Sequence, residues 1–231
     1  LIGRDAASRA VKRLGVRPIK TGKYPIIFEA PIATSIISSL ISAISGGNLY
    51  RETSFLLNSI NTKIASDALS IIENPFLKKG HASSNFDMDG VRLNERSIMD
   101  KGHLQSYLLS SYSARKLGMK TTGNAGGSHN LIVSPSKNTL EQLIQGVDKG
   151  LLVTELLGHG LNMVTGDYSR GAAGFWIESG KIQHAVEEIT IASNLKDMLL
   201  NIKAIGSDVY SNSSKYTGSI MIEPMTVATN S

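Results

Sequence analysis

Residues 151–182 read LLVTELLGHGLNMVTGDYSRGAAGFWIESGKI, a stretch that holds six of the chain's 22 glycines and its only tryptophan. Two apolar runs, residues 151–157 and 172–177, lie on either side of a polar segment, residues 165–171. The runs predict two buried strands, and the glycines permit positive φ or close backbone approach between them. A polar segment held between buried strands can present groups to a ligand or partner. It can equally be a tight, hydrogen-bonded crossover.

On both sides of this stretch, short apolar runs alternate with turn signals and capped helices. After it we expect a hairpin of residues 174–177 and 181–182, a strand at 188–192, a helix capped by Ser193 or Asn194, and a last strand at 218–222 closed by Pro224. Before it we expect strands at 24–28, 67–72 and 131–134, a hairpin of 95–99 with 103–109, and helices at 5–14, 31–44, 111–117 and 138–147, the last capped by Asn138 with Glu141. Because no βαβ rhythm repeats, the predicted class is α+β, with antiparallel or mixed β-sheets, hairpins and four or five separated helices.

The helix expected at residues 31–44 has an unusual composition. Isoleucine and leucine make a broad apolar face, and every polar position is serine or threonine. Such a helix offers nothing to titrate and nothing to bind a metal. We therefore expect it to be buried and structural.

Composition limits the function classes. The net charge is +5 and the basic residues are scattered in short clusters without interleaved aromatic residues, so nucleic-acid binding is disfavoured. The absence of cysteine excludes disulfides and thiolate sites and fits a reducing cytoplasm. No apolar run approaches the length of a membrane span. The first residue is leucine, and we expect the chain to be part of a longer polypeptide.

Neither a metal site nor a nucleophile stands out from the residue spacing. The five histidines form no metal-binding pattern, and no serine lies in a G-x-S-x-G or S-x-x-K motif. Glu155 and Asp167 could form an acid/base pair, but charged turn residues are the commoner case, and Arg170 is expected to pair with Asp167. The glycine-rich loop at 121–130 could hold an anion through its backbone, but it lacks the nucleotide-binding patterns. Residues 87–90 (DMDG) predict a turn rather than a calcium loop.

Several long strings resemble the TldD/PmbA family, specifically its PmbA/TldE branch. They are YRETSFLL (50–57), SYSARKLG (111–118), TGNAGGSHN (122–130), VTELLGHG (153–160), TGDYSRGAAGFWIESGKI (165–182) and EITIASNLKDM (188–198). The resemblance covers nearly the whole chain and is to the C-terminal half of a protein about twice as long, so residues 1–231 are expected to be that C-terminal region.

The resemblance implies a cytoplasmic bacterial protein in a family described as metalloproteases of unfolded or small peptides. The family is linked to microcin maturation and antitoxin turnover, and its older label is modulator of DNA gyrase. Its working unit is expected to be a TldD–TldE heterodimer, in which TldD carries zinc on an H-E-x-x-x-H helix and a late cysteine.

This chain departs from the TldD pattern at the residues that would bind zinc. The matching window on the helix at 31–44 is approximately residues 37–42, ISSLIS, and it contains neither histidine nor glutamate. A zinc hydrolase needs three protein ligands and a general base. The resemblance therefore implies a non-catalytic subunit with no cofactor of its own, and zinc in a TldD-type partner.

Two alternatives remain for the role of the polar residues. In the favoured one, they line a peptide chamber or a subunit interface; the candidates are Gly166, Asp167, Tyr168, Ser169, Arg170, Asn124 and His129. In the other, the chain is itself a hydrolase with a non-metal site near Asp167 and Ser169.

Overall fold

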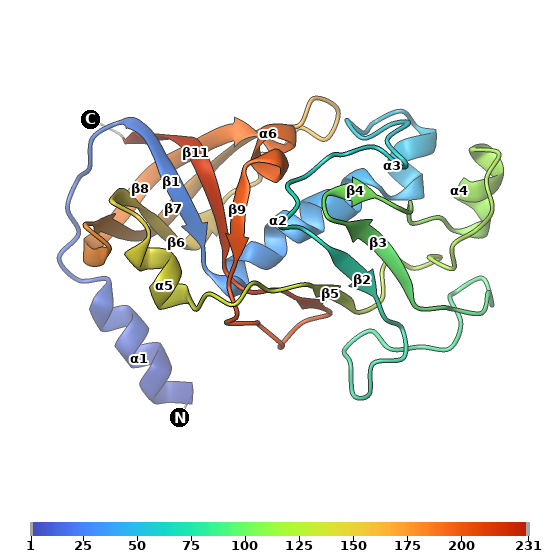
Figure 1. The fold of residues 1–231 in the computed structure, drawn as a ribbon, viewed down its shortest axis with the longest axis horizontal. Coiled ribbons are helices and arrows are strands. Elements are labelled where there is room, and N and C mark those ends of the chain that lie inside the picture. The colour runs from blue at the N-terminus through green and yellow to red at the C-terminus, as the bar shows by residue number, and fades with distance from the viewer. Residues whose placement is uncertain (1, 230–231) are drawn as a thin grey trace.

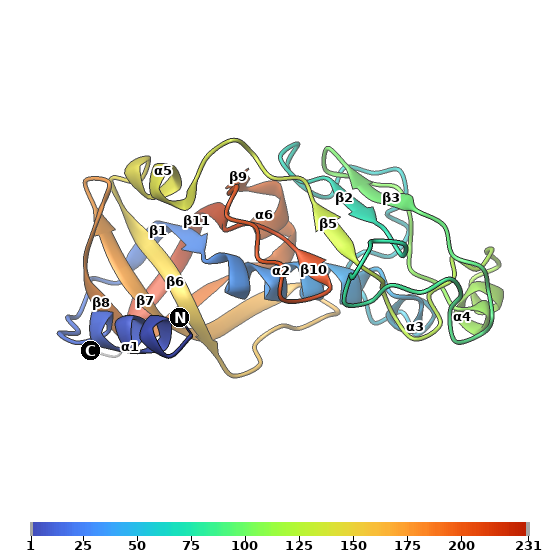
Figure 2. The same cartoon turned by 90° about the horizontal axis from the view of Figure 1, so that it is seen from below.

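The computed structural model describes residues 2–229, which form a β-barrel joined by one long helix to a smaller lobe (Figures 1 and 2). The larger sheet has the strand order β1-β6-β7-β8-β11-β9, and pairing of β1 with β11 closes five of its strands into a barrel. Its strands are β1 Gly22–Phe28, β6 Lys149–Leu157, β7 Asp167–Glu178, β8 Lys181–Asn194, β9 Ile202–Ile205 and β11 Ile220–Thr229. Every pair is antiparallel except β1 with β6. The predicted α+β class is confirmed.

The second sheet builds the smaller lobe. Its order is β10-β5-β2-β3-β4, with β2 Ile71–Glu73, β3 Arg96–Asp100, β4 His103–Leu104, β5 Leu131–Val133 and β10 Lys215–Tyr216. The helices α3 Gly46–Tyr50 and α4 Ser111–Lys116 belong to this end of the molecule (Figure 1). The remaining helices are α1 Ile2–Lys12, α2 Ala30–Ala43, α5 Leu140–Gln145 and α6 Leu195–Leu200. Of the six helices within residues 2–229, α3 was not predicted.

Helix α2 runs from the end of β1 toward the smaller lobe (Figure 2). Ile36, Ile37 and Leu40 on this helix are completely buried in the main core, which continues into the barrel. Two of its serines bond to the helix itself: the Ser38 hydroxyl donates to the carbonyl of the residue one turn earlier at 2.8 Å, and Ser39 does so at 2.9 Å. Such bonds satisfy polar groups inside an apolar environment. The buried Ser35 hydroxyl has no partner among the described residues. The predicted buried, structural helix is confirmed.

A smaller core lies on the outer face of the barrel. There α5 packs Leu143 and Ile144 against Ile27, Leu152 and Ile177. The strands that carry these residues have their other faces in the main core, so β1 and β6 are covered on both sides. This explains why residues 151–157 read as an apolar run rather than a strict alternation.

Three local predictions are wrong. The cap of α5 is Thr139, whose hydroxyl accepts from Gln142 N while the Gln142 side chain accepts from Thr139 N. The predicted capping pair, Asn138 and Glu141, has the same spacing but lies one residue earlier in the chain. β11 does not end at Pro224. The strand changes register there, so a residue without an N–H is tolerated between its two paired halves. Of residues 103–109, only the first two form a strand.

No helix within residues 2–229 has both the length and the apolar character needed to cross a membrane.

Candidate functional site

The polar segment at 165–171 belongs to the β6–β7 hairpin, so the crossover that the sequence left open does not form. Residues 158–166 form the loop, which folds back onto the start of β7 and bonds to its backbone. Ser169 N donates to Gly160 O at 2.7 Å, and Asn162 N donates to Asp167 O at 2.8 Å. Gly160 lies so close to β7 that a Cβ at this position would overlap the carbonyl oxygen of Ser169. The glycine is therefore needed for close approach.

Asp167 joins this loop to α6. Its carboxylate accepts from the Thr165 hydroxyl at 2.6 Å and from Asn194 Nδ2 at 3.1 Å, and these two bonds lower the pKa of the carboxyl group. Asn194 also caps α6 by accepting from Lys196 N. Asp167 is solvent-exposed, and its contacts are those of a residue that fixes a loop.

Tyr168 and Arg170 point to the opposite face of β7. Tyr168 is 3% exposed, burial raises its pKa to about 12, and its hydroxyl has no hydrogen-bond partner among the described residues. Arg170 donates from Nη2 to Gly158 O at 2.6 Å. The predicted pair of Arg170 with Asp167 is wrong, because residues an odd number apart on a strand face opposite sides.

Ser169 lies on the exposed face of β7. Among the side-chain hydrogen bonds of residues 2–229, none involves its hydroxyl, and the carboxylate of Asp167, two residues away, is bonded to Thr165 and Asn194 instead. Glu155, which could have formed an acid/base pair with Asp167, instead accepts from Arg13 at 2.6 Å. The arrangement therefore gives Ser169 no general base, which nucleophilic catalysis by serine requires.

Asn124 and His129 meet around a buried carboxylate that the sequence did not single out. Glu73, at the end of β2, is 1% exposed. Its Oε1 accepts from Asn124 Nδ2 at 2.9 Å and from His129 N at 2.8 Å, and His129 Nδ1 lies 3.2 Å from the same oxygen. Its Oε2 accepts from Arg96 Nη2 at 2.5 Å. The sequence signal that could have revealed this carboxylate was Glu73 itself, a single glutamate at the end of an apolar strand.

Arg96 and Asp87 complete this network, which we call the Glu73 cluster (Glu73, Asp87, Arg96, Asn124 and His129). Arg96 also donates to Asn124 Oδ1 and to the carbonyl of Thr122. Burial would raise the pKa of Asp87, but bonds from the backbone N–H groups of Ala125, Val91 and Asp89 outweigh burial and lower it. Asp87 thus ties its own turn to the glycine-rich loop, in agreement with a turn rather than a calcium loop at 87–90.

A small pocket of about 210 Å³ lies between this loop and the end of α2. Its lining is neutral: Ile41, Ser45, Gly46, Gly47, Leu108, Ser110, Ser113, Asn124, Gly127 and Ser128. Groups of three or more metal-ligating side chains do not occur anywhere in residues 2–229. In the window where the resemblance expects zinc ligands, Ile37 is buried and the Ser38 hydroxyl is bonded to Thr34 O. These donors do not fit a zinc ion.

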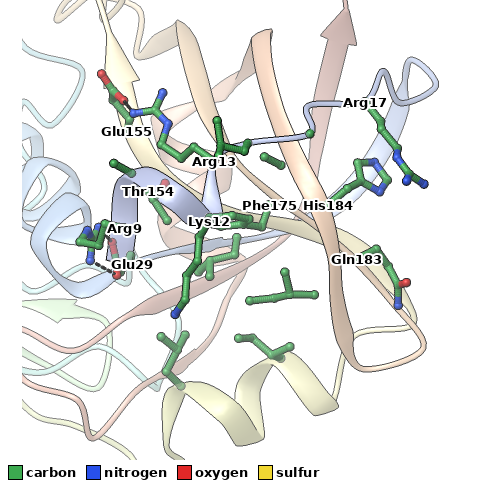
Figure 3. A pocket seen from close by; sticks show the side chains of 18 of the residues that line it. Arg9, Lys12, Arg13, Arg17, Glu29, Thr154, Glu155, Phe175, Gln183 and His184 are labelled. Atoms are coloured by element: carbon green, nitrogen blue, oxygen red, sulfur yellow. Dashed lines mark hydrogen bonds and ion pairs between the residues drawn. The ribbon is translucent and has the colours of Figure 1, made fainter. Parts of the chain in front are cut away.

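A larger hollow, of about 1060 Å³, lies elsewhere, between α1 and the outside of the barrel (Figure 3). Leu152, Phe175 and Ile144 line its apolar part. Charged residues surround it, among them Arg9 of α1, Arg13 just after α1, Glu29 between β1 and α2, and Glu155 of β6. Glu155 is the one residue considered for acid/base chemistry that lines it, and the seven candidates for a peptide chamber or subunit interface do not.

The family model and the curated relatives indicate the same protein family. The family model described as "PmbA/TldA metallopeptidase C-terminal domain" matches residues 21–229. Metalloprotease PmbA of Escherichia coli O157:H7 is 48% identical over 227 residues, which are 98% of this chain and 50% of that protein. The Haemophilus influenzae homologue is 47% identical over 230 residues, 99% of this chain and 51% of that protein. The chain thus spans about half the length of these curated relatives.

Solved structures agree with this family. A putative modulator of DNA gyrase from Bacteroides thetaiotaomicron has a TM-score of 0.94 and 36% identity, covering 99% of this chain and 52% of that one. TldE from Thermococcus kodakarensis has a TM-score of 0.85 and 25% identity, covering 97% and 54%. The chain belongs to the PmbA/TldA metallopeptidase family, whose C-terminal domain occupies residues 21–229.

Proposed function

We propose that this chain is a PmbA/TldE-type, non-catalytic subunit that works with a TldD-type zinc peptidase on unfolded or small peptides. The observation that carries the proposal is the chemistry of α2. At the positions where TldD-type chains are expected to hold H-E-x-x-x-H, this helix has Ile37, Ser38 and Ser42. Isoleucine cannot ligate zinc, and neither serine can replace the glutamate that activates water.

The contacts of α2 support a structural role for this helix. Ile37 is buried in the core that joins the two lobes, and the Ser38 hydroxyl is used within the helix. Opening this region for a metal ion and a substrate would disrupt the main core. Zinc and the general base are accordingly assigned to the partner subunit.

The chain's contribution in this proposal is to shape the space in which the peptide is held. Two rigid segments are suited to that task. The 165–171 segment is fixed by Asp167 and by the return of the hairpin loop, and the 122–130 loop is fixed by the Glu73 cluster. Rigid loops that carry polar groups serve well as walls of a binding site, since little ordering is required on binding.

The proposal predicts an outcome for metal content and activity. Chain purified alone should contain no stoichiometric zinc and should not cleave an unfolded peptide. Mixed with a TldD-type chain, it should co-elute in size-exclusion chromatography and increase zinc-dependent cleavage. The control is a TldD-type chain whose H-E-x-x-x-H glutamate is replaced by glutamine, which should assemble without activity.

Two results would contradict the proposal. One is stoichiometric zinc in the isolated chain together with cleavage that a chelator abolishes. The other is metal-independent cleavage by the isolated chain that is lost in Asp167→Ala or Ser169→Ala, which would establish the alternative hydrolase.

A further inference from the structure

Helix α1 is attached to the barrel by charged side chains rather than by a core. All its residues with described side chains are exposed, including Ile2 and Val11. Arg9 binds Glu29 at 2.6 Å, and Arg13 bridges Glu155 at 2.6 Å and Glu187 at 3.0 Å. Exposed ion pairs of this kind hold a helix only weakly. The family's C-terminal domain begins after this helix, at residue 21.

Between α1 and the barrel, the structure leaves the hollow of about 1060 Å³ (Figure 3). Its floor is apolar, with Leu152 and Phe175 from the barrel and Leu140 and Ile144 from α5. Leu14, two residues after α1, also lines the hollow and is 75% exposed. The helix therefore stands away from a surface that it could otherwise cover.

The first 20 residues carry the net charge of the chain, and four of their basic residues line the hollow beside three glutamates (Arg9, Lys12, Arg13 and Arg17 beside Glu29, Glu141 and Glu155). Residues 1–20 hold six of the 24 basic residues and one of the 19 acidic residues, so they account for the whole net charge of +5. The rest of the chain is neutral overall. Arg9 and Arg13 are paired with glutamates, whereas Lys12 and Arg17, which also line the hollow, make no ion pair among the described residues. His184, in the same lining, has a buried Nε2 without a hydrogen-bond partner there.

We propose that α1 and the barrel face beneath it form a docking groove for an acidic, amphipathic helix of a polypeptide from outside these 231 residues. The apolar side of that helix would fill the space over Leu152 and Phe175. Its carboxylates would pair with Lys12 and Arg17. An amphipathic helix recognised in this way lays its apolar face in a hydrophobic groove. Basic side chains beside the groove favour a helix with carboxylates at its edges.

The shape of the surface favours a polypeptide over two other polyanions. The apolar floor is recessed between α1 and α5, where a flat lipid surface would not reach it. A nucleic-acid duplex would meet the basic side chains but would leave the apolar floor unfilled, since its binding depends mainly on phosphate contacts. Side chains projecting from a helix can reach both the floor and the cations.

Binding of synthetic peptides tests the proposal without any TldD-type partner, so its outcome is separate from that of the proposed function. The probe is a fluorescently labelled peptide about as long as α1, with leucines at helical spacing and glutamates on the opposite face. The reference is a scrambled peptide of the same composition. We expect the amphipathic peptide to bind at least about tenfold more tightly in fluorescence anisotropy at about 0.15 M salt.

Substitutions on the chain then locate the binding surface. The double variant Lys12→Glu with Arg17→Glu should weaken binding at least about tenfold, and Leu14→Gln should weaken it as well. The matched control is Lys120→Glu, a charge reversal on an exposed lysine after α4, which should leave binding unchanged. Circular dichroism checks that every variant is folded.

Three outcomes would overturn the proposal. They are equal binding of the scrambled peptide, unchanged binding by the double variant, and tighter binding of phosphatidylglycerol vesicles or duplex DNA than of the amphipathic peptide. In the last case the groove would be part of a surface that binds membranes or nucleic acid.

Discussion

Replacing Glu73 with alanine is expected to lower the free energy of unfolding by about 3–5 kcal/mol, the usual cost of removing one partner from a buried ion pair. Glu73 is 1% exposed, and its Oε2 accepts from Arg96 Nη2 at 2.5 Å. Without the carboxylate, the charge of Arg96 would remain in a largely buried position. Asn124 Nδ2 and His129 N would also lose their acceptor.

Urea unfolding followed by circular dichroism measures this effect. Glu73→Gln should cost less than alanine, because an amide oxygen still accepts hydrogen bonds while the charge pairing with Arg96 is lost. Glu95→Ala is the matched control on the same lobe. Its carboxylate is exposed and, within residues 2–229, is bonded only to Asn74 Nδ2, so we expect a loss of about 0–1 kcal/mol.

The effect of Glu73→Ala should also be visible locally, in the loop that the Glu73 cluster holds. Because it fixes the 122–130 loop, Glu73→Ala should increase amide exchange at His129 more than in the barrel strands. A loss of less than about 1 kcal/mol for Glu73→Ala would mean that the cluster is not a linked unit, since breaking a buried pair costs several times more.

The cluster illustrates what the sequence could and could not predict. The glycine-rich loop that contains Asn124 and His129 was recognisable as a special loop. Its anchor was not, because Glu73 lies 51 residues before Asn124 and nothing in local spacing connects them. Contacts of this kind depend on which strands become neighbours, here β2 and β5. Periodicity within a strand does not determine that choice.

Elements with a strong local signal were predicted well. The residue pattern of α2 predicted both the helix and its burial, because the apolar face is broad and its polar side chains are short ones that can bond within the helix, as Thr34, Ser38 and Ser39 do. The hairpins around Lys101–Gly102 and Ser179–Gly180 were also predicted. Ser179 and Lys101 have positive φ and are each followed by a glycine with positive φ, so these turns are encoded in a few adjacent residues.

The barrel itself was not predictable from such signals. Its closure depends on the pairing of β1 with β11, which lie almost 200 residues apart, and of β1 with β6. The continuation of β11 past Pro224 follows from this closure, because the second half of the strand pairs with β8 as well as with β1. Proline locally indicated the end of a strand, and the tertiary pairing overrode that preference.

The exposed helix α1 shows a different limit of prediction from sequence. Its apolar spacing predicted a helix at residues 5–14, and the structure places one at Ile2–Lys12. Apolar spacing usually indicates the face that packs on the core, yet here the side chains are exposed. Helix α1 thus has an apolar pattern but no core to pack against, and the proposed groove lies beneath it.

The second large effect is expected at Gly160, where alanine should lower the free energy of unfolding by about 3 kcal/mol. The added Cβ would overlap the carbonyl oxygen of Ser169, and a backbone atom of a paired strand cannot move aside as a flexible side chain would. The φ of Gly160 is not in the left-handed region, so the overlap alone carries the expectation. Urea unfolding measures the loss.

Gly47→Ala is the matched control, since no heavy atom lies within 4 Å of its added Cβ. It also lies in α3, where alanine is preferred over glycine by about 0.5–1 kcal/mol, so this variant should be neutral or slightly more stable. Amide exchange distinguishes local from global effects: in Gly160→Ala the Ser169 amide, which donates to Gly160 O at 2.7 Å, should lose protection first. If the protection of the Ser169 amide and the free energy of unfolding were both the same in Gly160→Ala as in the parent chain, the hairpin loop would not be what fixes Asp167. The 165–171 segment could then not serve as a rigid wall of a peptide-binding site.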